Sequence, residues 1–483
     1  MRKFLAVLIS FSVIMACFCV SSCKKTTKPS CKYVLTAEYR EKENTFSGAL
    51  KVEYINSTAK ELNELNFNLY PNAYRKNALY PPVSENYRQT AYYDGESYGD
   101  VTITSVNGAR TWSIDGVDEN ILSVRLCSPL GVGDKVTIDI SFVTELAKIN
   151  HRLGVTKQTV NLANAFPVLC EYKDGEFIQT PYSTLGDPFS GGFADYTVNL
   201  TLPSAYTVAS CGKTSVTKEL ESKKKYELTI ENARDFACVI SKNYDVEEIT
   251  VGGTTIKYFY YDDNTASSHL GLIKACFEFF SEKFGAYPYP NYTVAQTGLC
   301  YGGMEYPSLA FVSGALGETE LTRSLVHETA HQWWYATVGS DQINESWQDE
   351  SLAEYSACLF FDARPEYGLA KADVVRESLT EYRSYFTVYG SVFGQTNTKM
   401  SRPLSEYSSE YEYRCLAYDK GVIMWDALQK SIGDKKFYAG LKNYYKDCKF
   451  KMATPTDLIT AFEKTGVSVK GLFDAFLSGK AVV

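Results

Sequence analysis

Histidine is scarce in this chain of 483 residues, which contains four copies, at His151, His269, His327 and His331. The thirteen cysteines form no C-x-x-C pair, which excludes a zinc site built from paired cysteines. Acidic residues outnumber basic ones and give a formal net charge of −8 at pH 7, so no nucleic-acid partner is expected. Beyond the N-terminal leader, no apolar run is long enough to span a membrane.

Most of the cysteines are predicted to be buried thiols. Cys17, Cys19 and Cys23 lie in the leader, whereas the other ten are scattered along the chain. Several of these, Cys238 and Cys276 among them, stand in apolar patterns typical of core positions. One or two disulfides stay open as an alternative, because the sequence cannot assign their partners.

The first residues have the layout of an export signal. Arg2 and Lys3 precede an apolar stretch over residues 4–20, and Val20-Ser21-Ser22-Cys23 resembles a bacterial lipobox. We therefore expect residues 1–30 to be a lipoprotein signal peptide and tether, with lipid on Cys23 and the protein anchored to the cell membrane outside the cytoplasm. An ordinary secretory peptide and a membrane-spanning anchor are the alternatives.

Hydrophobic patterning divides the rest of the chain into two parts. Alternation with a period of two recurs through residues 31–244, for example over residues 65–69 and 136–142, and indicates antiparallel strands. Helical patterns dominate residues 245–483, where residues 269–284 and 416–432 are examples. The predicted fold class is α+β, with an N-terminal antiparallel β domain followed by a mostly helical domain.

Two of the four histidines form the motif His327-Glu328-Thr329-Ala330-His331. Side chains four residues apart on a helix lie on one face, so both imidazoles can bind one Zn²⁺ while Glu328 reaches a water at the metal. Glu350 offers a third ligand, which leaves a fourth position open for catalysis. The alternative is a solvated helical face that carries the motif by chance.

Two predicted helices bring these ligands together. Residues 321–338 have one apolar side and are predicted to form a single helix that ends before Gly339. Ser346-Trp347-Gln348-Asp349 has the pattern of a capping box, which begins a second helix that ends before Pro365. Glu350 then lies in the first turn of a helix that can pack antiparallel to the first.

Three neighbouring segments extend the motif. The histidines continue into Gln332-Trp333-Trp334, and Glu350 lies within Trp347-Gln348-Asp349-Glu350-Ser351-Leu352-Ala353-Glu354-Tyr355. Upstream stands Gly302-Gly303-Met304-Glu305-Tyr306-Pro307, and downstream stands Ala417-Tyr418-Asp419-Lys420-Gly421. Together they resemble the aminopeptidase N / leukotriene hydrolase-like gluzincin family of zinc metallopeptidases, in a short bacterial form. Tyr306 departs from the asparagine of the family's G-x-M-E-N motif.

The resemblance implies a fold and an activity. It implies saddle-like sheets over residues 31–244, then a thermolysin-like zinc catalytic domain over residues 245–483 with one Zn²⁺ per chain. The expected enzyme is a zinc-dependent aminopeptidase that hydrolyses the N-terminal peptide bond through a zinc-activated water. Glu328 would act as the general base, and Tyr418 would donate to the oxyanion. Tyr411 and Tyr413 lie close enough in sequence to compete with Tyr418.

Substrate contacts are expected at the G-x-M-E-N-like segment. Gly302 and Gly303 lack Cβ atoms, so a peptide backbone can approach them closely. Glu305 can pair with a cationic α-amine, which selects substrates with a free N-terminus. The alternative for Glu305 is an exposed carboxylate at a strand end. We name no site residue in the β domain, because the family's usual glutamine there has no clear counterpart.

Two other functions remain open, a zinc endopeptidase of thermolysin type and a non-catalytic surface binding protein. Glu305 favours the aminopeptidase, and the intact ligand set with Glu328 disfavours loss of catalysis. The expected partners are peptides and, through the lipid anchor, a membrane, and the chain is expected to be a monomer. Larger family members continue into further domains beyond the point that corresponds to Val483, so a more open cleft is expected here.

Overall fold

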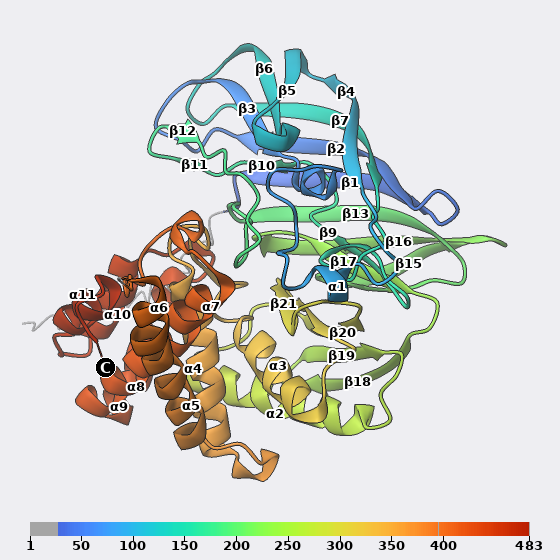
Figure 1. Cartoon of the computed structure of the whole chain (residues 1–483). Coiled ribbons are helices and arrows are strands. Elements are labelled where there is room, and N and C mark those ends of the chain that lie inside the picture. Colours follow the sequence, from blue (N-terminus) through green and yellow to red (C-terminus); the bar gives the residue numbers. More distant parts are fainter. Residues whose placement is uncertain (1–27, 395, 483) are drawn as a thin grey trace, which may run out of the picture.

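The computed structural model describes residues 28–394 and 396–482. Cys23 and almost all of the expected leader lie outside the described residues. Strands gather in the first part of the chain and helices in the last part, as Figure 1 shows. This order confirms the predicted α+β class, whereas the exact domain boundaries stay a prediction.

A seven-stranded sheet forms the centre of the N-terminal part, in the order β15-β16-β13-β1-β2-β7-β4. Its strands in chain order are β1 (Cys31–Arg40), β2 (Thr45–Ile55), β4 (Asp100–Asn107), β7 (Lys135–Glu145), β13 (Ala194–Pro203), β15 (Lys213–Glu219) and β16 (Lys223–Ala233). Buried and more exposed side chains alternate strictly along β1, as expected of a sheet with one face on a core. Its neighbours are antiparallel except for the parallel pair β1–β13.

Two four-stranded sheets and a short hairpin complete this part. One sheet has the order β10-β3-β6-β5 and the other β14-β17-β9-β8, while β11 pairs with β12. Their bounds are β3 (Leu62–Asn68), β5 (Ala109–Asp115), β6 (Ile121–Leu130), β8 (Leu153–Val155), β9 (Val160–Ala163), β10 (Val168–Leu169), β11 (Tyr172–Lys173), β12 (Glu176–Phe177), β14 (Thr207–Ser210) and β17 (Ala237–Ser241). A short helix, α1 (Arg88–Ala91), lies in the connection from β3 to β4.

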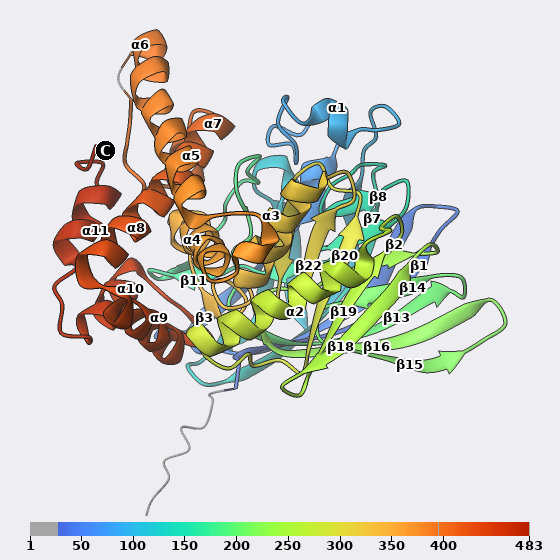
Figure 2. The ribbon, with the colours of Figure 1, turned by 90° about the horizontal axis from the view of Figure 1, so that it is seen from below.

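A five-stranded sheet begins the second part, in the order β18-β19-β20-β22-β21. Its strands are β18 (Asp245–Val251), β19 (Thr254–Tyr260), β20 (Asn291–Thr297), β21 (Gly303–Tyr306) and β22 (Leu309–Ser313). Helices α2 (Ala266–Lys283) and α3 (Glu318–Ala330) pack on it, as Figure 2 shows from below. The edge strand β21 carries the G-x-M-E-N-like segment.

This sheet separates two hydrophobic cores. On β22, Leu309 and Phe311 belong to the core of the N-terminal part, whereas Ala310 and Val312 belong to the helical core. Successive side chains of a strand point to opposite faces, so one strand contributes to both cores. On β21, Met304 therefore faces the N-terminal part, and its neighbours in sequence face α3.

Helices make up the rest of the chain (Figure 1). They are α4 (Trp347–Ala363), α5 (Lys371–Ser384), α6 (Gly390–Phe393), α7 (Glu410–Tyr413), α8 (Lys420–Ile432), α9 (Asp434–Cys448), α10 (Pro455–Glu463) and α11 (Lys470–Leu477). A two-stranded sheet joins β23 (Val338–Gly339), before α4, to β24 (Lys451–Met452), between α9 and α10. Among the described helices, none has the length and apolar character needed to cross a membrane.

The cysteines of the described part are free thiols. Nine of these ten are buried and one, Cys127, is exposed. This agrees with the prediction of buried thiols.

Candidate active site

Helices α3 and α4 bring two histidines and a glutamate together. The Nε2 atoms of His327 and His331 lie 3.0 Å apart, and each lies 3.4 Å from Oε2 of Glu350. Ligand atoms of a tetrahedral zinc ion with bonds of 2.0–2.1 Å are about 3.3 Å apart. The Oε2 atom of Glu350 is buried without a hydrogen-bond partner, as expected of an atom whose partner is a metal ion. The three side chains therefore fit a zinc ion.

Both imidazoles are oriented by a second contact. Nδ1 of His327 lies 2.8 Å from Oε2 of Glu354, and Nδ1 of His331 lies 3.0 Å from the carbonyl oxygen of Trp334. Both acceptors require a proton on Nδ1, which leaves Nε2 free as the metal ligand. Sequence reasoning missed the role of Glu354, although its helical spacing from Glu350 was a signal for it.

Glu328 lies in the same pocket, with one carboxylate oxygen buried and unpartnered. Burial raises the pKa of Glu328 to about 7, against the lowering effect of His327 and His331. Gly303 packs directly on this carboxylate, since a Cβ at that position would lie 2.2 Å from Oε1 of Glu328. A Cβ on Gly302 would meet only Ser324 Oγ at 3.8 Å, so Gly302 borders open space.

Tyr418 lies beside the metal ligands on a π-helical turn, Arg414–Asp419, that precedes α8. Its ring stacks on His327 with ring centroids 6.0 Å apart. Of the two competing tyrosines, Tyr411 donates its hydroxyl to the carbonyl of Glu381, while Tyr413 packs edge-on against Tyr418. Single π-helical turns inside helices often occur at functional sites. The arrangement favours Tyr418 among the three.

Two further buried carboxylates converge on Glu350 beside the histidines. Oxygen atoms of Asp187, Glu305 and Glu350 lie within 4.8 Å of one another. Nε2 of Gln342 donates to Oε1 of Glu305 at 3.1 Å and fixes that carboxylate. Burial, followed by the neighbouring carboxylates, raises the pKa of Glu305 well above its usual range. Such a cluster calls for a cation.

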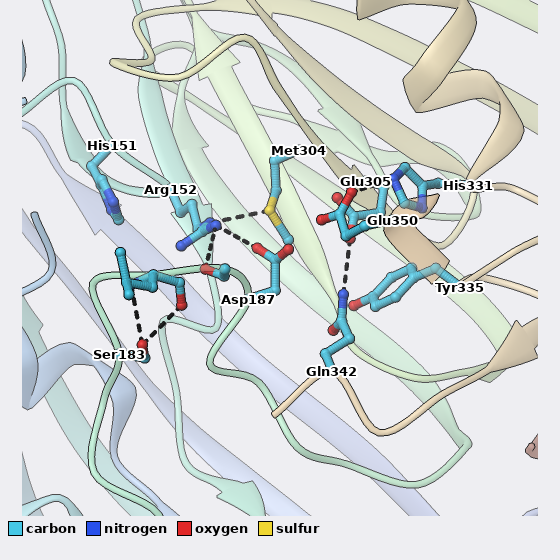
Figure 3. A network of polar contacts seen from close by, with 12 residues as sticks. His151, Arg152, Ser183, Asp187, Met304, Glu305, His331, Tyr335, Gln342 and Glu350 are labelled. Carbon is cyan, nitrogen blue, oxygen red and sulfur yellow. Dashed lines mark hydrogen bonds and ion pairs between the residues drawn. The ribbon is translucent and has the colours of Figure 1, made fainter. Parts of the chain in front are cut away.

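Asp187 links this cluster to the β domain. Figure 3 shows its carboxylate between Arg152 and the Glu305–Glu350 pair. Arg152 donates to Asp187 and to the carbonyl of Gly186, and its Nε lies 3.1 Å from Sδ of Met304. Burial raises the pKa of Asp187 to about 6, and Arg152 opposes that rise. Sequence reasoning missed both residues, because no local pattern ties these loop positions to β21.

The site opens into a cleft of about 900 Å³ between the two parts of the chain. Seven carboxylates and three guanidinium groups line it, together with tyrosines from both sides. The carboxylates are Asp187, Glu305, Glu320, Glu328, Glu350, Glu354 and Glu410, and the guanidinium groups belong to Arg152, Arg323 and Arg414. A cleft with this excess of carboxylates favours a positively charged ligand group.

Two local predictions about the helices were wrong. Residues 321–338 do not form one helix, because α3 ends at Ala330 and Tyr335 has a φ of 148°. The capping box is absent from α4, since Ser346 caps no backbone N–H and its Oγ is buried without a partner. Asp349 instead accepts from Ser340 Oγ and the backbone N–H of Glu350.

The remaining histidines lie away from the metal ligands. His151 is buried with Nδ1 2.6 Å from the hydroxyl of Tyr74, and His269 lies between Asp263 and Glu318. The predicted ligand residues, by contrast, are brought together, with Glu305, Gly303 and Tyr418 around them. Their catalytic and binding roles remain predictions that variants can test.

The ligand set, on a helix pair that follows a five-stranded sheet, defines a zinc site of the gluzincin class. Residues 269–476 match the Peptidase family M1 domain. This match confirms the resemblance seen in the sequence. The cofactor implied by this family and this site is zinc.

Several named relatives share part of the sequence. The chain is 24% identical over 245 residues to human endoplasmic reticulum aminopeptidase 2, covering 46% of this chain and 24% of that protein. It is 27% identical over 170 residues to leukotriene A-4 hydrolase from Xenopus laevis (32% and 25% covered). It is 23% identical over 206 residues to aminopeptidase N from Streptomyces lividans (39% and 23% covered). The matches thus span about a quarter of the length of these relatives.

Solved structures share the fold along nearly the whole chain. An M1 zinc metallopeptidase from Deinococcus radiodurans has a TM-score of 0.63 at 17% identity, covering 94% of this chain and 95% of that chain. A variant of it, solved with the substrate Tyr-Ser-Ala, has a TM-score of 0.62 at 16% identity with the same coverage. This likeness establishes the two-part fold.

Proposed function

We propose that the protein is a zinc-dependent aminopeptidase that removes the first residue from peptides with a free N-terminus. One observation carries this proposal, the convergence of Asp187, Glu305 and Glu350 beside the His327–His331 pair. Asp187 and Glu305 are two carboxylates next to the ligand set, and they suit a cationic amine that lies one residue from the cleaved bond. The relatives named as aminopeptidases support the same activity.

The substrate amine would be held from both parts of the chain. Glu305 comes from the edge strand of the catalytic sheet, and Gln342 keeps its carboxylate in place. Asp187 comes from the β domain, where Arg152 holds its carboxylate beside the site. The backbone of an internal peptide segment has no charged amine to offer this cluster, so binding there favours removal of a terminal residue.

The chain's own residues can perform the proton transfers of hydrolysis. Zinc held by His327, His331 and Glu350 would activate water and polarise the scissile carbonyl. Glu328 would take a proton from the attacking water and deliver it to the leaving nitrogen. The Tyr418 hydroxyl would donate to the carbonyl oxygen as negative charge develops there.

The test compares a peptide that has a free amino terminus with its N-acetylated twin, with and without a chelator. We expect release of the first residue from the free peptide alone, and loss of that release with chelator. Equal internal cleavage of both peptides would favour the thermolysin-type endopeptidase. Absence of cleavage from both, with zinc present, would favour a non-catalytic binding protein.

The Glu305→Gln variant examines the amine contact in the same assay. We expect a lower kcat/KM for the free peptide, because a neutral amide replaces one of the anionic partners of the amine. The exposed residue Glu366 offers a matched Glu→Gln control away from the cleft. An unchanged kcat/KM in Glu305→Gln would assign the amine to other residues.

We also propose that the mature protein is a monomeric lipoprotein, anchored to the cell membrane outside the cytoplasm. The support is Val20-Ser21-Ser22-Cys23 after an apolar stretch. In the producing bacterium, Cys23→Ala should abolish incorporation of labelled fatty acid and release the protein from the membrane fraction after export. Sedimentation of the leaderless protein would test the monomer. Label retained in Cys23→Ala would contradict the lipid site.

A further inference from the structure

The cleft continues past the metal ligands in the direction opposite to Glu305. Glu305 lies by Glu350, in the first turn of α4, whereas Glu354 is one turn further along that helix. Helix α3 runs antiparallel to α4, and Arg323 lies on it one turn before His327. Arg323 and Glu354 thus lie at the end of the cleft where the leaving part of a peptide would extend.

Arg323 lies at the cleft wall, and some of its N–H groups make no hydrogen bond to the described residues. One of its terminal nitrogens donates to Oε2 of Glu377 at 3.0 Å. Its Nε is buried and has no hydrogen-bond partner among the described residues. A guanidinium group has five N–H donors, and an unpartnered buried N–H is costly. The single bond to Glu377 leaves further N–H donors on the terminal nitrogens of Arg323, and these can bind an acceptor group of a ligand.

A second guanidinium group borders the same end of the cleft. Arg414 begins the π-helical turn that carries Tyr418, and it donates to Oε2 of Glu381 at 3.2 Å. Glu377 and Glu381 are one turn apart on α5, so a single helix face holds both arginines in place. Both arginines line the cleft.

The other charged groups nearby are already engaged or lie at the rim. Arg152 is buried against Asp187, and Glu354 accepts from His327. Glu410 accepts from Ser84 and from Asn86, whereas Glu320 lies in the first turn of α3. The cleft therefore has converging carboxylates at one end. At the other end lie two guanidinium groups, each paired with one carboxylate of α5, beside Glu354.

We propose that Arg323 and Arg414 form a carboxylate-binding subsite that holds the C-terminal carboxylate of a short peptide. This subsite rests on the proposed aminopeptidase function, because it assumes that the substrate amine is bound at Glu305 and Asp187. One helical turn is about 5.4 Å and an extended residue spans at most about 3.6 Å. A carboxylate bound one turn beyond the cleaved bond belongs to the first or second residue after it. The substrate class is thus dipeptides and tripeptides.

The experiment uses the zinc-loaded protein and matched peptides. The set is Leu-Ala-Ala as the free acid, its C-terminal amide, the pentapeptide Leu-Ala-Ala-Ala-Ala, and the amide of Leu-Glu-Ala. We expect kcat/KM for the tripeptide acid to exceed that for its amide and for the pentapeptide by about 10-fold to 100-fold. In the double variant Arg323→Ala/Arg414→Ala, the ratio of acid to amide should fall to near one.

Arg376→Ala is the matched control. Arg376 is an exposed arginine on α5 that pairs with Asp373 and does not line the cleft. It should keep the wild-type ratio. Equal rates for the acid and its amide in the wild-type protein would overturn the subsite, as would an undiminished ratio in the double variant. A preference for the Leu-Glu-Ala amide that matches the tripeptide acid would overturn the C-terminal assignment and attribute recognition to an acidic side chain.

Calorimetry separates failure of this subsite from failure of the proposed function. Glu328→Gln would be titrated with the tripeptide acid and with its amide. If no peptide is cleaved by the wild-type protein but the acid binds Glu328→Gln more tightly than the amide does, the subsite stands without the hydrolytic activity. Equal affinities of acid and amide would overturn the subsite, whatever the activity.

Discussion

At the scale of single residues, the unpartnered carboxylate oxygens of the site determine its chemistry. Glu328 has a buried, unpartnered carboxylate oxygen beside two imidazoles that are themselves fixed through Nδ1. An unpaired buried oxygen is costly in free energy and persists where a substrate or ion supplies its partner. The same argument applies to Oε2 of Glu350.

Glu328→Gln tests the proton-transfer role. The amide cannot accept a proton from water, so kcat should fall by about 10²–10⁴-fold. Zinc should stay bound, because the metal ligands His327, His331 and Glu350 are untouched. Turnover numbers and metal analysis on the same preparation check both points. Retained turnover with zinc bound would contradict the proton-transfer role of Glu328.

Gly303→Ala tests how closely β21 packs on Glu328. The added Cβ would lie 2.2 Å from Oε1 of Glu328 and must displace that carboxylate or the strand. We expect kcat to fall about 10-fold or more, since misplacement of a catalytic group by about 1 Å can cost 10²-fold. Gly302→Ala should lose less, because its Cβ meets only Ser324 Oγ at 3.8 Å. Equal losses in both variants would contradict the role of Gly303.

At the scale of secondary-structure elements, tertiary contacts override the local sequence pattern at the end of α3. The apolar pattern of residues 321–338 favoured one long helix, yet the chain leaves the helix after Ala330. Trp333 and Trp334 are buried in the helical core, and the carbonyl of Trp334 orients His331. Packing in the helical core and the contact between Trp334 and His331 thus override the helical period, and a short window of sequence shows neither.

Glu354→Ala tests the contact between α3 and α4. Without its carboxylate partner, the His327 ring loses its fixed orientation, so zinc affinity should drop about 10-fold to 100-fold. Competition with a chelator of known affinity measures this change. Asp362→Ala, at an exposed position near the end of α4, is the control. Unchanged zinc affinity in Glu354→Ala would show that the ring needs no such partner.

Asp235 provides a pH test at the contact between the two parts of the chain. It follows β16 and accepts the hydroxyl of Tyr335, in the loop after α3, at 2.6 Å. Burial raises the pKa of Asp235 to about 7, against the lowering effects of Tyr335 and Arg234. Between its ordinary pKa of 3.8 and about 7, the folded state binds more protons than the unfolded state, so this group lowers stability as pH rises.

Asp235→Asn removes that dependence and keeps an acceptor for Tyr335. The free energy of unfolding of the wild type, relative to the variant, should decline from pH 4 to pH 7 by on the order of 2–4 kcal/mol. Denaturant unfolding at several pH values measures it. A relative stability that stays constant over this window would show that Asp235 is ionised throughout in the folded state.

At the scale of the whole molecule, zinc is expected to stabilise the catalytic domain. The ion binds the folded site and not the dispersed ligands of the unfolded chain, so it adds about 4 kcal/mol at a zinc concentration 1,000 times Kd. Treatment with a chelator should lower the Tm, and added zinc should restore it. Calorimetric scans with metal analysis check this. Identical scans of protein with and without bound zinc would contradict it.

Much of the architecture could be predicted from the sequence, because it depends on local periodicity. Alternation over residues 136–142 indicated the strand β7, and the pattern of residues 269–284 indicated α2. The termini of α4 were close to the prediction as well, although Ser346 makes no capping bond. The order of strands, including the parallel pair β1–β13, depends on contacts between distant segments and could not be predicted in this way.

The sequence by itself predicted the two histidines of the zinc site and the position of Glu328 between them, because helical geometry relates residues four apart without reference to the rest of the chain. Glu350 joins them through the packing of α4 against α3. Only the tertiary structure decided what surrounds them. Asp187 and Arg152 enter the amine end from loops of the β domain, and α5 holds Arg323 and Arg414 at the other end. These groups are brought together by the packing of separate elements, so no spacing along the chain predicts how close they lie to the metal ligands.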